Sequence, residues 1–511
     1  MGKCISFTES ENSSQSVSCD ITLEHTTFFG NKFFLPQGLI SLEINNGSQS
    51  IQFKSVTFFD NGISSTREDL MIDSVLCVVR GTNVNISISS STFSSEYAKV
   101  LSGSAEDISL HIYNSTFHGH RGRTTGGVIS LQGTNLCKLN VSKSSFANTS
   151  AVVGGAISTE CFIIDAASLN QNNFTNNTAS SVGGALYIKA FRASVVLRHL
   201  TFTNCKTLGV AGSGGLIDNR LESPNRKPDN ELVLTMENCH FEVCVTEGNT
   251  SIIIRGSLTV FYKTQININI SNSNFISNYG ALTIALRPHL PELTANSKSI
   301  KKSYVKIQNT MFLHNNGFRA PVLIAVSNQS VVIFQNVTME LNRVFSNGLG
   351  GAAYVGIDCF LIIQNCRFSM NKADIGGGAL YVAVNSLIVK DSFFVGNKIS
   401  FLLSGDGGAL SVVNAETVVI FNTTFRNCSG SGGGAISAEG CGNITIKKSQ
   451  FVENNAGYVG ELGFGGGAIN VMDCRVIFEE TTFHRNTGLL GGAVYLQNGA
   501  CLLYTSDAAD E

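Results

Sequence analysis

One motif recurs along this chain and limits the folds that the chain can adopt. A Phe, or once a Met, heads a short segment that reads roughly Phe-x-x-Asn, and sixteen copies follow one another at intervals of 24 to 39 residues. The anchors are Phe28, Phe58, Phe93, Phe117, Phe146, Phe174, Phe202, Phe241, Phe275, Phe312, Met339, Phe368, Phe394, Phe425, Phe451 and Phe483. A repeat of this length indicates a stack of similar structural units.

The spacing of apolar residues inside each unit indicates strands. Alternations of two to five residues, such as Ile266-Asn-Ile268-Asn-Ile270 and Ile444-Thr-Ile446, are separated by Gly, Asn and Ser. These are short strands joined by turns, and no unit has the 3.6-residue periodicity of a helix. Such units close by coiling into one rung each, so that every strand pairs with its copies above and below. We therefore predict an all-β fold, a single-stranded parallel β-helix solenoid of about sixteen rungs.

The repeated positions acquire roles in such a rung. Phe side chains at one place on successive rungs should stack in the interior, where each buried ring contributes about 1.5 to 3 kcal/mol. Paired glycines such as Gly183-Gly184 should form a corner where a Cβ would clash or φ is positive. Asn tolerates left-handed backbone angles, and its amide can bond to its copy one rung away, so we expect an Asn ladder in a turn. Ten anchors carry Asn three residues on: Asn31, Asn61, Asn177, Asn278, Asn315, Asn342, Asn371, Asn397, Asn454 and Asn486.

The two motifs together resemble a known family. Gly-Gly-Ala-Ile alternating with Phe-x-x-Asn is similar to the repeat of the chlamydial polymorphic outer membrane proteins, whose passenger regions belong to the right-handed β-helix, or pectin-lyase-like, class. The resemblance implies a right-handed coil and a role in cell-surface adhesion. It covers nearly all of residues 20–500 and is best carried by Gly154 to Ile157, Gly183 to Leu186, Gly407 to Leu410, Gly433 to Ile436, Gly466 to Ile469 and Gly491 to Val494.

Composition limits the partners and the compartment. The net charge is −2 without a basic stripe, so nucleic acid is not an expected partner, and no run of about 20 apolar residues predicts a membrane span within this chain. Fourteen cysteines and fifteen Asn-x-Ser/Thr sequons favour an extracellular or cell-surface glycoprotein. The candidate glycosylation sites are Asn12, Asn46, Asn85, Asn114, Asn140, Asn148, Asn173, Asn176, Asn249, Asn269, Asn328, Asn336, Asn422, Asn427 and Asn443.

One pair of cysteines occupies equivalent places in adjacent repeats. Cys441 and Cys474 each follow the second glycine of a Gly-Gly-Ala-Ile by seven residues. Strands lie about 4.8 Å apart in a sheet, which is within the Cα separation that a disulfide requires. We predict a disulfide here, with a ladder of buried free thiols as the alternative. No Cys-x-x-Cys pair indicates zinc, and no motif indicates a cofactor.

The repeat also sets the expected domain boundaries. Residues 1–19 read as a lead-in that we expect to be truncated, because no signal peptide follows Met1 and no anchor is recognised. The β-helix is expected over residues 20–503, and the tail 504–511 fits no rung and is expected to be foreign to the protein. Insertions at residues 218–231 and 287–303 lengthen their repeats, either as part of a binding face or as solvated loops.

The predicted function is binding. β-Helical enzymes that cleave acidic polysaccharides need clustered carboxylates, whereas the 15 aspartates are scattered here, so we expect no catalytic residues. We predict a non-catalytic surface or secreted solenoid that binds glycans, extracellular proteins or copies of itself. The alternative is a polysaccharide lyase or hydrolase of the pectin-lyase-like class.

The candidate binding face is the position that follows Gly-Gly-Ala-Leu/Ile. Polar residues such as Ser158, Asp218, Ser411, Ser437 and Asn470 are expected at this position on some rungs, which predicts that it faces water. Exposed rings there would offer rigid contacts to a partner, and the alternative is that they only cover their sheet. The rings are Tyr187, Tyr354, Tyr381 and Tyr495.

Overall fold

The computed structural model places the chain in two compact units, Met1–Thr264 and Gln265–Glu511. Every regular element that it describes is a β-strand, and its described residues include no helix long and apolar enough to cross a membrane. The described residues are 5–8, 17–33, 40–43, 47–59, 61–63, 75–94, 98–209, 212–219, 231–246, 256–262, 265–286, 302–318, 320–326, 330–345, 347–356, 359–400, 406–457 and 465–504.

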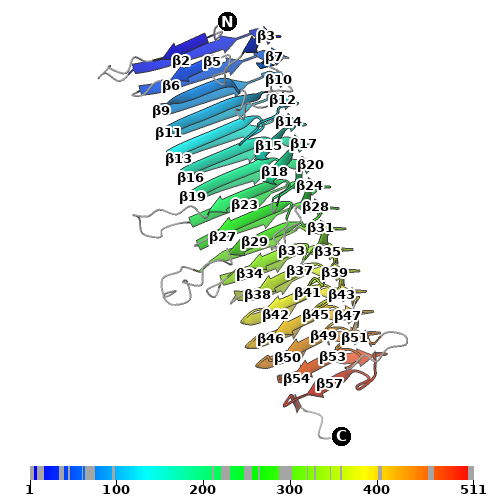
Figure 1. The fold of residues 1–511 in the computed structure, drawn as a ribbon. Helices are drawn as coiled ribbons and strands as arrows, with labels where there is room; N and C mark the ends of the chain where they lie inside the picture. The colour runs from blue at the N-terminus through cyan, green and yellow to red at the C-terminus, as the bar shows by residue number, and fades with distance from the viewer. Residues whose placement is uncertain are drawn as a thin grey trace. The chain divides into compact units, whose positions relative to one another are not determined.

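Successive rungs of each unit lie above one another as parallel arrows (Figure 1). A typical rung runs through four strands: two that flank a bend, a three-residue strand centred on the anchor, and a short strand before the Gly-Gly corner. In the first unit the two strands before the anchor often merge into one long bent strand, as in β9 (Val75–Ser89), β11 (Lys99–Tyr113) and β13 (Ile129–Ser142).

The other strands of the first unit follow the same scheme. The strands before the anchor are β1 (Ile5–Thr8), β2 (Val17–Glu24), β5 (Ile40–Glu43), β6 (Gly47–Lys54), β16 (Ile157–Asn170), β19 (Leu186–Arg198), β22 (Gly215–Asn219), β23 (Glu231–Glu237) and β26 (Leu258–Tyr262). The anchor strands are β3 (Thr27–Phe29), β7 (Thr57–Phe59), β10 (Thr92–Ser94), β12 (Thr116–His118), β14 (Ser145–Ala147), β17 (Asn173–Thr175), β20 (Thr201–Thr203) and β24 (His240–Glu242). The short strands are β4 (Lys32–Phe33), β8 (Gly62–Ile63), β15 (Ser150–Val153), β18 (Thr178–Val182), β21 (Lys206–Thr207) and β25 (Val245–Thr246).

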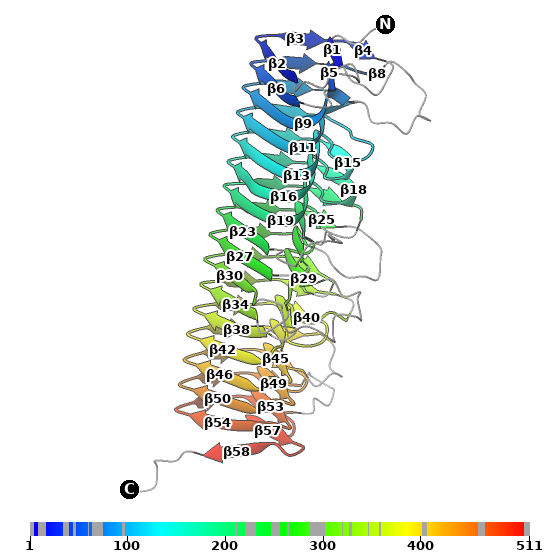
Figure 2. The ribbon, with the colours of Figure 1, turned by 90° about the vertical axis from the view of Figure 1, so that its left-hand side faces the viewer.

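The second unit has the same order with shorter strands (Figure 2). Before the bend lie β29 (Leu282–Leu286), β33 (Val322–Ala325), β37 (Ala353–Gly356), β41 (Leu380–Ala383), β45 (Leu410–Val413), β49 (Ile436–Glu439), β53 (Ile469–Met472) and β57 (Val494–Gln497). After it lie β27 (Gln265–Ser271), β30 (Tyr304–Gln308), β34 (Ser330–Gln335), β38 (Cys359–Gln364), β42 (Ser386–Lys390), β46 (Thr417–Phe421), β50 (Asn443–Lys447), β54 (Arg475–Glu479) and β58 (Cys501–Tyr504). The anchor strands are β28 (Asn274–Ile276), β31 (Met311–Leu313), β35 (Thr338–Glu340), β39 (Arg367–Ser369), β43 (Phe393–Val395), β47 (Thr424–Arg426), β51 (Gln450–Val452) and β55 (Thr482–His484). The short strands are β32 (Asn316–Gly317), β36 (Arg343–Val344), β40 (Lys372–Ala373), β44 (Lys398–Ile399), β48 (Ser429–Gly430), β52 (Asn455–Ala456) and β56 (Thr487–Gly488).

The anchor residues pair with one another from rung to rung. Phe117 is aligned with Phe93 on one side and Phe146 on the other, and the same parallel register continues through the anchor strands of each unit. Each unit contains eight anchor strands, so the predicted all-β parallel β-helix, with a total of sixteen rungs, is confirmed.

The stacked anchor rings form the interior of each unit. In the first unit neighbouring ring centroids lie 4.5 to 5.2 Å apart, from the Phe28–Phe58 pair to the Phe93–Phe117 pair. Phe174, Phe202, Phe368 and Phe451 are each 0% exposed, as predicted. Parallel stacking adds about 0.5 to 1.5 kcal/mol per pair to the burial of each ring.

The predicted Asn ladder is present and buried. Asn371 Nδ2 donates to Asn397 Oδ1 at 3.0 Å, and the same bond joins Asn278 to Asn315 and Asn342 to Asn371. The ladder asparagine does not itself take the left-handed conformation, however, because the residue before it does, as Met370 shows with φ 54°. Other side chains take the ladder place on some rungs: His120, Thr149, Cys205, Cys244 and Cys428.

The paired glycines form the second corner for the predicted reason. Gly183 has φ +67°, and a Cβ added to Gly184 would lie 2.0 Å from the carbonyl oxygen of Ser213 on the next rung. Backbone therefore passes too close to backbone here for any side chain.

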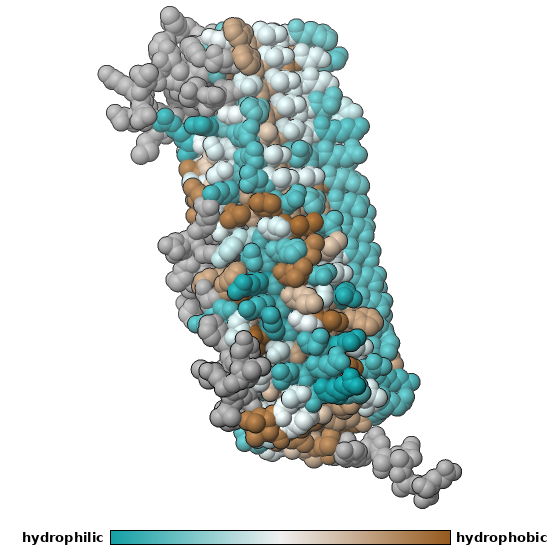
Figure 3. Space-filling model, turned by 90° about the vertical axis from the view of Figure 1, so that its right-hand side faces the viewer, coloured by the Kyte–Doolittle hydropathy of each residue, from teal (hydrophilic) through white to brown (hydrophobic). Residues whose placement is uncertain are grey.

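The outer side of the anchor strands is mostly hydrophilic, with scattered apolar side chains (Figure 3). Phe29 and Phe59 are 67% and 50% exposed at the start of the first unit, and Met370 and Phe393 are 55% and 51% exposed in the second.

Candidate binding site

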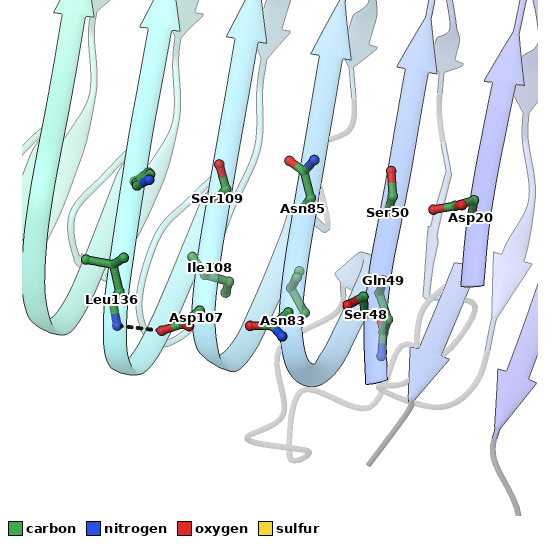
Figure 4. Close-up of a pocket in the computed structure, with 12 residues that line it drawn as sticks. Asp20, Ser48, Gln49, Ser50, Asn83, Asn85, Asp107, Ile108, Ser109 and Leu136 are labelled. Atoms are coloured by element: carbon green, nitrogen blue, oxygen red, sulfur yellow. Dashed lines mark hydrogen bonds between the residues drawn. The ribbon is translucent and has the colours of Figure 1, made fainter. Parts of the chain in front are cut away.

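A hollow lies on the outer face of five consecutive rungs of the first unit, formed by β2, β6, β9, β11 and β13 (Figure 4). One outward side chain from each strand lines it, and strand pairing aligns these five residues directly. In order they are Asp20, Ser50, Asn85, Ser109 and Lys138. Strand geometry places neighbours in this row about 4.8 Å apart.

A second row lines the hollow at the bend of the strands. It consists of Ser48, Asn83 and Asp107, aligned in the same register, with Leu136 at its end. Asp107 Oδ1 accepts the backbone N–H of Leu136 at 3.1 Å and the Asn135 side-chain amide at 2.8 Å, so this carboxylate is held in place (Figure 4).

The floor of the hollow contains one polar group with no partner among the described residues. Gln49 is 2% exposed; its Nε2 donates to the Arg80 carbonyl, whereas its Oε1 accepts no hydrogen bond. The hollow has a volume of about 470 Å³. This lies within the range of small-molecule sites, about 300 to 1,000 Å³, so the hollow is large enough for a small saccharide or a peptide segment.

The predicted tyrosine face is only partly open to solvent. Tyr187, Tyr354, Tyr381 and Tyr495 are all half-buried. Tyr354 and Tyr381 are aligned on β37 and β41 and stack with their ring centroids 5.5 Å apart.

The Gly-rich corner explains the limited exposure of this row. A Cβ added to Gly376 would lie 2.7 Å from the Tyr381 ring, so the corner packs directly on that ring. On other rungs the same row is 4% exposed at Ser158, 1% at Ser411 and 3% at Asn470. The expectation that this position faces water is therefore wrong at Ser158, Ser411 and Asn470, and the half-buried tyrosines meet it only in part.

One residue assigned to this row lies elsewhere. Strand pairing aligns Tyr187 with Leu216, whereas Asp218 is aligned with Lys189, two positions further along the rung. On this rung the corner is formed by Gly212-Ser213, because Gly212 has the left-handed φ of +70° and Gly214 does not. The Gly-Gly pair read from the sequence is thus displaced from the corner.

Most candidate glycosylation sites lie on the surface. Asn269 is half-buried, and its buried Oδ1 has no hydrogen-bond partner among the residues that the structure describes. Asn12, Asn46, Asn249 and Asn328 lie outside the described residues. The exposed sequon asparagines are Asn85, Asn114, Asn140, Asn148, Asn173, Asn176, Asn336, Asn422, Asn427 and Asn443.

Two of these sequons form a second, exposed ladder in a turn. Asn176 Nδ2 donates to Asn148 Oδ1 at 3.0 Å, and Asn204 Nδ2 donates to Asn176 Oδ1 at 2.8 Å. Because Nδ2 is the atom to which a glycan is attached, glycosylation of Asn176 would compete with this hydrogen bond.

The predicted cysteine pair has the expected register without a bond. Cys441 and Cys474 are both buried free thiols, and the Cys441 backbone N–H donates to Cys474 Sγ at 3.0 Å. The hydrogen bond to Cys474 and burial raise the pKa of the Cys441 thiol. A disulfide at this position stays a prediction for oxidised, secreted protein.

The structure contains a different disulfide, between Cys137 and Cys161, with Cα atoms 6.1 Å apart. Sequence reasoning missed it because these cysteines are not aligned: strand pairing opposes Cys161 to Gly133 and Cys137 to Ile164. A Cβ on Gly133 would lie 2.5 Å from Cys137 Sγ, so the glycine makes room for the bridge.

Parts of the predicted site regions are not described. Residues 220–230 and 287–301 of the two insertions, and 505–511 of the tail, lie outside the described residues. Within the described part of the chain, no group of three His, Cys, Asp or Glu side chains is placed to hold a metal ion.

Comparisons with known proteins give little further guidance. No protein-family model and no solved structure matches the chain. A stretch of 150 residues, 28% of the chain, is 30% identical to the metabotropic glutamate receptor-like protein R of Dictyostelium discoideum. The match spans only 9% of that relative's length.

Proposed function

We propose that this chain is a non-catalytic extracellular or cell-surface solenoid that binds glycans or proteins. We also propose that its coil is right-handed and pectin-lyase-like, because its repeats resemble those of the polymorphic outer membrane proteins. The observation that carries the proposal is the hollow on β2 to β13, where five rungs each contribute one polar side chain. Exposed sequons and the Cys137–Cys161 disulfide support an oxidising, secretory location. The similarity of one segment to a protein named as receptor-like agrees with a surface role.

The chemistry of the hollow suits recognition of polar chains. Its rows supply hydroxyl groups, amides, two carboxylates and one ammonium, which together donate and accept hydrogen bonds. They are attached to paired strands, so little backbone entropy is lost when a ligand binds. A sugar or peptide lying across the strands would meet one polar group per rung.

The test is a filling substitution in the secreted full-length chain. Ser109→Trp places an indole in the hollow, and Ser109 is a half-buried, outward residue whose replacement leaves the interior intact. We expect this variant to lose binding to cell surfaces and to a glycan array. The control is Thr445→Trp, at an outward half-buried position of β50 in the second unit, which should retain binding.

Glycosylation of Asn85 must be controlled because its sequon lies in the hollow. Ser87→Ala removes the sequon and keeps the Asn85 amide, so a glycan that blocks the hollow would be revealed by stronger binding of this variant. Unchanged binding by Ser109→Trp would exclude the hollow as the site. A wild-type protein that binds no cell, glycan or protein would contradict the proposed function as a whole.

A second candidate function is cleavage of a polysaccharide, because Asp20 and Asp107 both line the hollow. Glycosidases place two carboxylates about 5 to 9.5 Å apart on either side of the scissile bond. Asp20 and Asp107 lie three strand spacings apart, roughly 14 Å at the backbone, so their geometry does not favour cleavage. The two functions differ in one measurement: an enzyme releases reducing or unsaturated sugar ends from polygalacturonate or alginate, and Asp107→Asn abolishes that release. We expect no release above a heat-killed control, with or without calcium.

A further inference from the structure

A row of cations crosses the second unit on the short strands that follow the anchors. Residue four after each anchor opens such a strand, and strand pairing aligns Arg343 of β36 with Lys372 of β40 and Lys372 with Lys398 of β44. We call Arg343, Lys372 and Lys398 the cationic row. Adjacent parallel strands place neighbouring members about 4.8 Å apart at the backbone.

The cationic row continues into neutral polar residues on both sides. Asn316 precedes Arg343 in the same register, and Ser429 and Asn455 follow Lys398. Along one sheet, this position therefore holds an amide, then three cations, then a hydroxyl group and a second amide. The fold itself accepts neutral residues at this place, so three successive cations are not a requirement of the β-helix.

The three charges are not compensated within the described part of the chain. Arg343 and Lys398 are exposed, Lys372 is half-buried, and none of the three takes part in an ion pair there. The Arg343 guanidinium lies over the Phe345 ring, 4.5 Å from its centroid. Asp374 follows Lys372 by two residues, and its Oδ2 accepts the backbone N–H of Asn347 at 3.2 Å.

This arrangement has an electrostatic cost. Like charges directly opposite one another on neighbouring strands destabilise a sheet. Burial, together with the charges of Arg343 and Lys398, lowers the pKa of Lys372, and Asp374 opposes this shift only in part. A row that is unfavourable in the free protein becomes favourable when an anion neutralises it, which is typical of a binding surface.

We propose that the cationic row binds an acidic polysaccharide, whose sulfate or carboxylate groups pair with Arg343, Lys372 and Lys398 while its hydroxyl groups bond to the flanking Asn316 and Ser429. This inference rests on the proposed binding function and names the class of ligand. A row one side chain wide, crossing parallel strands at regular intervals, fits a linear chain with repeated charges. Nucleic acid fits less well, because a net charge of −2 gives no wider basic surface.

The experiment measures binding of the secreted full-length chain to dextran sulfate, polygalacturonate and neutral dextran. The test variant is Arg343→Gln/Lys372→Gln/Lys398→Gln, which keeps polar side chains at positions where the row elsewhere has Asn and Ser. The control is Lys306→Gln/Lys390→Gln/Lys448→Gln, which removes the same charge from described positions of the second unit outside the row.

We expect the wild type and the control to bind at least one polyanion and not neutral dextran. Since three exposed ion pairs are lost, the test variant should bind about thirtyfold more weakly. Added salt should weaken binding by the wild type, because it screens exposed charges. Dextran sulfate and polygalacturonate distinguish a preference for sulfate from one for carboxylate.

Several outcomes would overturn the inference. Equal losses in the test and control variants would show a general charge effect rather than a site. Tighter binding to duplex DNA, lost in the test variant, would assign the row to nucleic acid. Binding to cells or neutral glycans without binding to either polyanion would reject the cationic row as a glycan site and leave the proposed function standing.

Discussion

The buried Asn ladder should be sensitive to loss of a single side chain. Asn371 is 0% exposed and its amide takes part in four hydrogen bonds. Nδ2 donates to Met339 O at 2.8 Å and to Asn397 Oδ1 at 3.0 Å, while Oδ1 accepts the backbone N–H and the Nδ2 of Asn342, both at 3.0 Å. Asn371→Ala removes all four bonds: the Asn342 backbone N–H loses its acceptor, whereas Asn397 Oδ1 still accepts the backbone N–H of residue 371 and Asn342 Nδ2 still donates to Phe312 O.

The size of the effect follows from these four bonds. A net contribution of about 1 kcal/mol for each gives a loss of about 4 kcal/mol in the free energy of local opening. Because 1.4 kcal/mol corresponds to a factor of ten, hydrogen exchange at the Asn342 amide should accelerate about a thousandfold. Asn371→Cys should cost about half as much, since Cys428 holds the same ladder place with its thiol 3.5 Å from Phe394 O.

Hydrogen–deuterium exchange with mass spectrometry is the suitable assay, because solenoid repeats can open locally. The peptide that covers residues 341–345 reports the Asn342 amide. The control is Asn365→Gly on the same rung, where Asn365 is exposed and has φ 52°, so glycine should change exchange little. Acceleration of less than tenfold in Asn371→Ala would refute the argument that the ladder bonds stabilise the rung.

Three further predictions concern other buried or half-buried groups. His120 is fully buried, and burial lowers its pKa to about 4, below the unfolded value of about 6.5. The free energy of unfolding should therefore fall by about 3 kcal/mol between pH 6.5 and pH 4. Urea titrations should show a smaller loss over this pH range in His120→Asn. Non-reducing peptide mapping should recover the Cys137–Cys161 pair, and Cys137→Ala/Cys161→Ala should lower the free energy of unfolding by about 3 kcal/mol, whereas free thiols in secreted protein would contradict the bridge. Replacing the stacked Tyr354 and Tyr381 together by Ser should cost about 2 to 3 kcal/mol of stability, and a drop in cell adhesion beyond the loss of folded protein would identify them as part of the binding face.

The candidate sites show how far residue spacing alone reaches. Arg343, Lys372 and Lys398 each stand four residues after an anchor, so counting from the anchors would have found the cationic row. The polar row of the hollow obeys the same rule, because Asn85, Ser109 and Lys138 each stand eight residues before the anchor of their rung. Spacing aligns this row but does not reveal the hollow beside it, which depends on how the long strands bend.

The sequence by itself determined the parallel β-helix, its rung count and the contents of its interior. Repetition is the reason: a Phe, an Asn or a glycine pair that recurs once per rung must meet its own copy, so one residue's neighbours can be read directly from the next repeat. The stacked rings of Phe174 and Phe202 and the bonded amides of Asn342 and Asn371 follow from this rule.

Only the tertiary structure decided features that depart from strict repetition. The register shifts between β13 and β16 bring Cys137 to Cys161 although their repeats do not align them, and the corner at Gly212 displaces Asp218 from the tyrosine row. The packing of Gly376 on Tyr381 likewise sets how much of that ring meets water. Such contacts join residues at unequal places in their rungs, so they depend on bulges and corners that spacing does not reveal.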